Sequence, residues 1–316
     1  MSHFTVLVVL PPTAPDKVDD ALAAALAPFD ENTSVDPYKS YLDEWQARYA
    51  SAVDYFIENP GKADPTGTVA DVLSAYTGDD VTEETDADTG VTMYYEMSTY
   101  NPQSKWDGWV VGGRWRDYFP VATVDKRDET GRFTMQGEPS WSNADERHKF
   151  GYVDGGSRGM LDFDRLRDER GTAAATEYDR WTAYTAGLPT ALPFATFADS
   201  TDDIEDARKL YWAQPVMAKI KADRAAGNRE FDSLFNEPMT KFGVSHNTYV
   251  QRARDQAVPG FAMLDLEGRW LAPGDMGWWG MSTDEDDDRV QYRARANEYL
   301  DSLAPDAIVI VVDCHV

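Results

Sequence analysis

The sequence contains a single cysteine, Cys314, so no intramolecular disulfide can hold the fold together. A chain of 316 residues buries roughly three quarters of its unfolded surface and folds without a covalent cross-link. Such sparse use of cysteine is typical of the reducing cytoplasm. It excludes a small disulfide-rich scaffold and favours a protein of the cell interior.

Long apolar runs are also absent. No segment approaches the length of about 20 apolar residues that a membrane-spanning helix needs. Residues 1–3 lead directly into a short apolar stretch, with neither a basic region nor a cleavage site, so we expect no signal peptide. These features predict a cytoplasmic protein without a membrane partner.

Basic residues are scarce, since 30 Lys and Arg stand against 56 Asp and Glu and give a net charge of −26. Contacts from Lys and Arg to phosphates dominate DNA affinity, so we expect no direct nucleic-acid binding. The acidity is either an imitation of the DNA backbone that occupies a host protein, or a solvated surface. Arginines interleaved with acids at residues 162–170 and 284–295 favour the solvated surface and predict no continuous acidic strip.

An apolar run rich in β-branched residues lies near each end of the chain. Residues 4–10 and 308–312 are too uniformly apolar for edge strands, so both are expected inside one sheet. Polar residues border both runs, at His3 and at residues 313–315. We therefore predict that the two terminal strands are antiparallel neighbours.

The region between these strands is mainly helical. Helical spacing and capping residues mark five segments, at residues 36–59, 69–76, 162–186, 202–225 and 284–303, the last capped by Ser282 or Thr283. Strand patterns occur at residues 91–100, 121–124, 132–135, 261–264 and 269–271; the second and third flank a polar turn, and the last two form a hairpin. Residues 78–90 are expected to be an acidic surface loop. The pattern predicts one large α+β domain over residues 1–316, with long helical insertions that include a helical subdomain at residues 161–250.

Residues 106–115 contain three tryptophans, two adjacent glycines and an arginine. Glycine permits close backbone approach, and Trp and Arg present flat faces that stack on rings, so the motif suits a planar anionic ligand. The candidate ligand-binding residues are Trp109, Gly112, Gly113, Arg114 and Trp115. The alternative is a strand with a glycine bulge whose tryptophans fill the core.

Residues 274–281 form a second cluster of glycines and aromatic residues, with Trp278 and Trp279 at its centre. The cluster precedes the predicted helix at 284–303, whose N-terminus is a natural anion site. We expect Trp278 and Trp279 to share one ligand site with the first motif, with Arg114 within reach of this loop. The alternative is a tight turn that plugs the core.

The chain ends form a third candidate site. Antiparallel pairing places His3 beside Asp313 and His315, which point to one face of their strand, while Cys314 points to the core. Two imidazoles and a carboxylate at this spacing fit a catalytic acid–base group or, if any metal is bound, its ligands. The alternative is a hydrogen-bonded polar cluster that closes the rim of the sheet.

Five segments together resemble one family. They are residues 1–8, 106–115, 161–164, 274–281 and 311–316, which read MSHFTVLV, WDGWVVGGRW, LDFD, GDMGWWGM and VVDCHV. They are similar, in this order and from end to end, to uncharacterised proteins encoded by tailed bacteriophages, including phages of actinobacteria. The resemblance implies a viral accessory protein in the cytoplasm of an infected bacterial host, and it implies no catalytic residue.

Three functions fit these features. The leading hypothesis is a protein that binds a nucleotide-like or other planar anionic small molecule, in counter-defence or host takeover. The second is a metal-assisted or acid–base hydrolase that uses His3, Asp313 and His315, with Arg114 neutralising the charge of the substrate. The third is an acidic DNA-mimic decoy. The expected partner is a small-molecule ligand or a host protein; the cofactor, and whether the protein is an enzyme, stay open.

Overall fold

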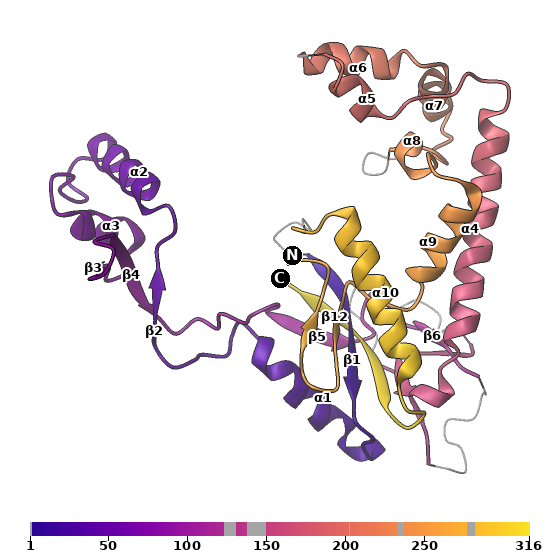
Figure 1. Ribbon diagram of the computed structural model, residues 1–316, viewed down its shortest axis with the longest axis horizontal. Helices are drawn as coiled ribbons and strands as arrows, with labels where there is room; N and C mark the ends of the chain where they lie inside the picture. The colour runs from indigo at the N-terminus through magenta and orange to yellow at the C-terminus, as the bar shows by residue number, and fades with distance from the viewer. Residues whose placement is uncertain (1, 123–130, 138–149, 202, 233–236, 277–281) are drawn as a thin grey trace. The chain divides into compact units, whose positions relative to one another are not determined.

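The chain folds into two compact units in the computed structural model, which describes residues 2–122, 131–137, 150–201, 203–232, 237–276 and 282–316 (Figure 1). The first unit comprises residues 1–25 and 108–316, and the second comprises residues 26–107. Residues 26–107 have their own sheet and core, and the one-domain organisation expected from the sequence stays a prediction. The predicted helical subdomain at 161–250 lies within the first unit.

A mixed sheet forms the centre of the first unit. Its strands run in the order β11-β10-β1-β12-β9-β7, and β5 also pairs with β12. Their bounds are His3–Leu10 for β1, Gly108–Val111 for β5, Thr134–Met135 for β7, Gly155–Ser157 for β9, Ala262–Leu264 for β10, Trp270–Leu271 for β11 and Ile308–His315 for β12. β1 and β12 are antiparallel from His3↔His315 to Leu10↔Ile308. The predicted α+β class and the adjacent terminal strands are confirmed.

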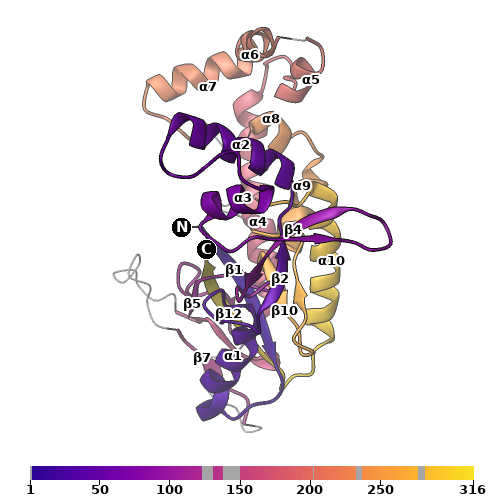
Figure 2. The same cartoon turned by 90° about the vertical axis from the view of Figure 1, so that its left-hand side faces the viewer.

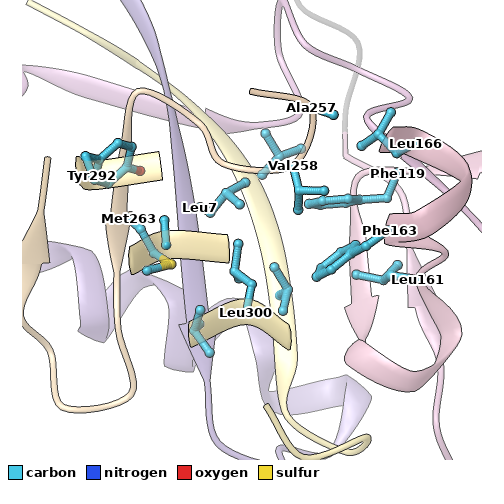
Figure 3. Close-up of a cluster of buried hydrophobic side chains, with 14 residues drawn as sticks. Leu7, Phe119, Leu161, Phe163, Leu166, Ala257, Val258, Met263, Tyr292 and Leu300 are labelled. Carbon is cyan, nitrogen blue, oxygen red and sulfur yellow. The ribbon is translucent and has the colours of Figure 1, made fainter. Parts of the chain in front are cut away.

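Both terminal strands are buried because neighbours flank them and a helical layer covers one face. β1 lies between β10 and β12, and β12 lies between β1 and the strands β5 and β9. α10 (Asp286–Ser302) runs alongside the sheet in both views (Figures 1 and 2). Leu300 of α10 and Phe163, the first residue of α4 (Phe163–Thr185), join Leu7, Met263 and Val309 in one apolar cluster (Figure 3). Burial of this cluster removes strongly apolar surface from water and anchors the helices to the sheet.

Most of the remaining helices of the first unit lie in the predicted helical region. α4 (Phe163–Thr185) begins at Asp162, whose side chain caps the helix by accepting the N–H of Arg165. The other helices are α1 (Val18–Leu26), α5 (Phe194–Ala198), α6 (Ile204–Trp212), α7 (Pro215–Ala225), α8 (Pro238–Lys241) and α9 (His246–Asp255). The segment expected as one helix at 202–225 is divided, because Pro215 cannot continue a helix and instead starts α7. None of the helices among the described residues is long and apolar enough to cross a bilayer.

The second unit consists of a three-stranded sheet and two helices. β4 (Thr92–Ser98) lies between β2 (Tyr38–Tyr41) and β3 (Thr82–Thr85), and the helices are α2 (Trp45–Glu58) and α3 (Val69–Thr77). Two predictions were wrong here. The helix expected from residue 36 begins only at Trp45, and the loop expected at 78–90 contains β3. In both cases the backbone pairs with β4: β2 does so across more than 50 residues, which local spacing does not encode, and β3 forms a hairpin with β4.

Two other local predictions also need correction. The N-cap of α10 is Glu285, which forms a capping box with Asp288, whereas Ser282 or Thr283 was expected. The strand expected at 121–124 lies partly outside the described residues, and the strand expected at 132–135 is shorter, since β7 comprises only Thr134–Met135. β6 (Phe119–Pro120) pairs with β8 (Tyr152–Val153), and β7 pairs with β9. The hairpin of β10 and β11 is confirmed.

The pairing of the terminal strands generates a stability prediction. Deleting residues 311–316 removes half of β12 and leaves backbone groups of β1 and β5 without partners, each costing about 1–3 kcal/mol when buried. We expect the truncated protein to show no cooperative thermal transition by circular dichroism. Deleting Val316 alone, which lies beyond the strand, serves as the control and should preserve the transition. A cooperative melt near the full-length midpoint after the longer deletion would contradict the central place of β12.

Candidate functional site

The polar ends of β1 and β12 meet, as their pairing predicts. Nδ1 of His3 lies 2.8 Å from Oδ1 of Asp313, and the rings of His3 and His315 have centroids 5.4 Å apart. Asp313 is buried, whereas His3 and His315 are partly exposed. A carboxylate only accepts hydrogen bonds, so this contact places the proton of a neutral His3 on Nδ1 and leaves Nε2 as an acceptor.

The second carboxylate oxygen of Asp313 fixes the glycine turn that follows β5. It accepts the backbone N–H of Arg114 at 2.9 Å. Gly113 has a φ of +52°, and a Cβ added there would lie 2.4 Å from Cβ of Asp313. Only glycine can bring the backbone this close in a left-handed conformation. Gly113 is therefore a structural requirement of the turn.

A second buried carboxylate, Asp154, supports the same turn from another side. Gly112 has a φ of +73°, and a Cβ there would lie 2.6 Å from Oδ2 of Asp154. Asp154 accepts the backbone N–H of Asp117 at 2.6 Å, that of Gly137 at 2.9 Å, and Nε2 of Gln136 at 2.6 Å. Burial raises the pKa of Asp154 although these hydrogen bonds oppose the shift. Sequence reasoning missed Asp154, because the glycine-rich segment around it matches no ligand motif.

The residues of the tryptophan–glycine motif at 106–115 thus have several different roles. Trp106 is buried in the second unit against Phe29. Trp109 lies on β5, opposite Cys314 of β12. The turn then carries Arg114 and Trp115 to the surface cavities described below. The structural alternative of a strand followed by a glycine turn therefore accounts for much of the motif.

The second glycine–aromatic motif is only partly described. Trp278 and Trp279 lie outside the described residues, so their shared site with Arg114 and Trp115 stays a prediction. At the described edge of the motif, the N–H of Asp275 donates to Oγ1 of Thr283 at 3.0 Å. This bond joins the described segments on either side of residues 277–281.

A cavity of about 680 Å³, the large cavity, lies beside Trp115. Its walls come from the first unit: α4, α9, α10, the turn after β5, β1 and the segment before β10. The aromatic residues that line it are Trp115, Tyr118, Tyr249 and Phe261. The charged residues that line it are Arg170, Arg180, Arg293 and Glu177. The lining thus combines aromatic surface with more positive than negative charge.

The acid of the large cavity is already neutralised by neighbours. Glu177 accepts hydrogen bonds from Nζ of Lys241 at 2.5 Å and from the hydroxyl of Tyr249 at 2.7 Å. Burial alone would raise the pKa of Glu177, but these two bonds outweigh it and lower the pKa. Within the described residues, Arg170 and Arg293 form no ion pair. The cavity therefore has positive charge to offer a ligand.

The aromatic hydroxyl of Tyr118 is a fixed part of this wall. It donates to the backbone oxygen of Val258 at 3.1 Å, and burial raises its pKa to about 12. The phenol consequently stays neutral and holds its ring in place. The positive charge of Arg170 acts to lower the pKa of Tyr118, so this guanidinium lies near the same wall.

A smaller cavity of about 330 Å³, the small cavity, adjoins the large one. Both cavities are lined by Trp115, Tyr118, Arg170 and Ala173. Arg114 and Arg116 line only the small cavity. Two of the candidate residues from the sequence, Arg114 and Trp115, therefore lie at cavities. The sequence did not predict Arg116, Arg170 and Arg293 as lining residues, because arginines in helices and turns have no distinctive spacing.

The three polar residues of the chain ends lie apart from the lining of both cavities. Thr5 connects the two places, because it pairs with Asp313 across the strands and also lines the large cavity. Among the described residues, no group of three or more His, Cys, Asp or Glu side chains has the arrangement of a metal site. Cys314 is buried, and burial raises the pKa of its thiol well above its usual value. The catalytic role of His3, Asp313 and His315 stays a prediction.

The glycine turn generates a prediction that separates crowding from backbone strain. Gly113→Ala combines a left-handed φ with a clash against Asp313, so we expect a loss of about 2–5 kcal/mol in unfolding free energy. Gly187→Ala is the matched control, since Gly187 has a φ of +78° but no atom within 4 Å of the added Cβ. It should lose only about 1–2 kcal/mol. Equal losses in urea denaturation would show that Asp313 does not restrict the turn.

Comparisons with known proteins leave the chain without a relative from which to transfer a function. Neither the family models, nor the curated proteins, nor the solved structures contain a match. The argument for function must therefore come from the geometry and charge of the site itself. On that basis, the cavities beside Trp115 are the strongest candidate site in the described part of the chain.

Proposed function

We propose that this protein binds a planar, anionic small molecule of nucleotide-like character in the large cavity beside Trp115. The observation that carries the proposal is that positive side chains outnumber negative ones around this cavity, although the chain as a whole is acidic. The chain has a net charge of −26, yet three arginines and one acid line the cavity. A role in counter-defence or host takeover is part of the same proposal.

The aromatic lining supports a planar ligand. Trp115, Tyr118, Tyr249 and Phe261 present ring surfaces that stack on, or pack edge-to-face against, a flat heteroaromatic ring. Such contacts contribute roughly 0.5–1.5 kcal/mol each beyond the burial of apolar area. The cavity volume of about 680 Å³ lies within the usual range of about 300–1,000 Å³ for small-molecule pockets.

The arginines support an anionic ligand. Arg293 is half-buried, and burial lowers the pKa of its guanidinium, with Arg289 adding repulsion. A negative ligand group would relieve that cost, because it replaces lost water with a charge-assisted hydrogen bond. Arg180 already pairs with Glu230, so Arg170 and Arg293 are the cations available to a ligand.

Binding is testable with purified protein and a panel of nucleosides, nucleotides and other aromatic acids. We expect at least one aromatic anion to bind in isothermal titration calorimetry and to quench tryptophan fluorescence. Arg170→Gln should weaken binding about tenfold or more, because a hydrogen bond to a charged group contributes about 1.5–3 kcal/mol. Arg48→Gln is the matched control, since Arg48 is exposed on α2 in the second unit. Equal affinities of the two variants would contradict the proposal.

A second candidate function is acid–base hydrolysis, which the His3–Asp313 contact favours. A buried carboxylate that orients an imidazole is the arrangement used by general bases. The position of these residues is less favourable, since neither His3 nor Asp313 lines the large or the small cavity. The decoy function has less support, because several described ion pairs alternate acids with arginines along helices, as in Arg165–Glu169 and Arg167–Asp164.

The two leading functions differ in what they require of His3. His3→Gln should leave ligand affinity within about twofold of the wild type if the cavity is a binding site, because His3 lines neither the large nor the small cavity. Under the hydrolase hypothesis, the same variant should abolish turnover of a bound substrate. The measurement is product formation by chromatography, alongside calorimetry. Turnover in the wild type that disappears in the variant would favour the enzyme.

A further inference from the structure

The small cavity has a lining that suits an anion. Arg114, Arg116 and Arg170 line it, together with the acids Asp117 and Glu169. The two acids already accept bonds from other residues. Gln136 donates to Asp117 at 3.0 Å, and Arg165 donates to Glu169 at 2.9 Å, where the hydroxyl of Tyr152 also donates. The three arginines, in contrast, form no ion pair within the described residues.

Arg116 supplies the second observation. Its Nε is buried and has no hydrogen-bond partner. A buried donor of a charged group that makes no hydrogen bond is costly, so such a group is expected to meet an acceptor in the working state of a site. Arg116 interacts electrostatically with Asp154, whose oxygens already accept hydrogen bonds from residues 117, 136 and 137. Arg116 also lines the small cavity, so an anion bound there would lie beside this guanidinium.

The turn that carries these arginines is preorganised. Asp117 has a left-handed φ of +60°, which a non-glycine residue adopts only when its surroundings impose it. Here Asp154 accepts the N–H of Asp117, and Gln136 binds its side chain. The carboxylate of Asp313 fixes the backbone at Arg114. A rigid backbone lowers the entropy that the arginines would lose on binding an anion.

The two cavities share a wall. Trp115, Tyr118 and Arg170 line both, so a ligand whose ring occupies the large cavity can extend a substituent into the small one past Arg170. We infer that the small cavity is an oxyanion subsite, formed by Arg114, Arg116 and Arg170, which takes the phosphoryl group of the planar ligand. This inference rests on the proposed function and narrows the ligand to the class of nucleoside phosphates. Planar guanidinium groups bind phosphate oxygens in pairs, which suits three arginines around one cavity.

The test compares ligands that differ only in the phosphoryl group. Four ribonucleosides and their 5′-monophosphates are titrated against the full-length protein by calorimetry, with inorganic phosphate as a competitor. We expect a monophosphate to bind about tenfold or more tightly than its nucleoside, because charge-assisted hydrogen bonds are added. Arg116→Gln should remove this difference while leaving nucleoside affinity unchanged. Arg114→Gln, at an exposed position, should reduce the difference, and Arg48→Gln should leave it intact.

The outcomes distinguish a failure of the subsite in the small cavity from a failure of the large cavity as a binding site. Equal affinity for nucleoside and monophosphate, or an equal loss for both in Arg116→Gln, overturns the subsite while the large cavity stands. Binding of inorganic phosphate that depends on Arg116, without any binding of nucleosides or nucleotides, supports the subsite and overturns the proposed function. No binding by any probe overturns both. Thermal midpoints of the variants show whether Arg116→Gln is folded, and Arg114→Gln provides the test if it is not.

Discussion

The antiparallel pairing of β1 and β12 is the constraint on which the rest of the first unit depends. It joins residues that are 298 to 312 positions apart in the sequence and buries an apolar strand from each end of the chain in one sheet. Because β12 also pairs with β5, the same strand positions the glycine turn that follows β5. The pairing therefore determines both the core of the sheet and the location of the candidate site.

Two buried carboxylates fix the backbone of the turn that lies beside the paired strands. Asp313 holds His3 on one oxygen and the N–H of Arg114 on the other. Asp154 holds the backbone at Asp117 and at Gly137. A buried carboxylate without donors would be strongly unfavourable, so each acid stabilises the fold only while the turn keeps its shape. The conformation of residues 112–117 is thereby tied to the stability of the sheet.

Charge distribution gives this surface its chemical character. The chain is strongly acidic, and the described helices pair many of their acids with arginines along their own length. Around Trp115 the balance is different, because the lining acids are engaged by other donors while Arg114, Arg116 and Arg170 form no ion pair within the described residues. Local positive charge in an acidic protein concentrates an anionic ligand at one place on the surface.

The sequence by itself determined the α+β class, the two terminal strands, and helices such as α3 and α4, because apolar periodicity and capping residues are local signals. It also indicated that His3, Asp313 and His315 converge, since pairing of the ends follows from their matched apolar runs. Only the tertiary structure decided which residues line a cavity. Arg170 on α4, Arg116 in a turn and Arg293 on α10 come together through long-range packing. The same applies to β2, whose backbone groups pair with the distant β4 and override the helix that local spacing predicts.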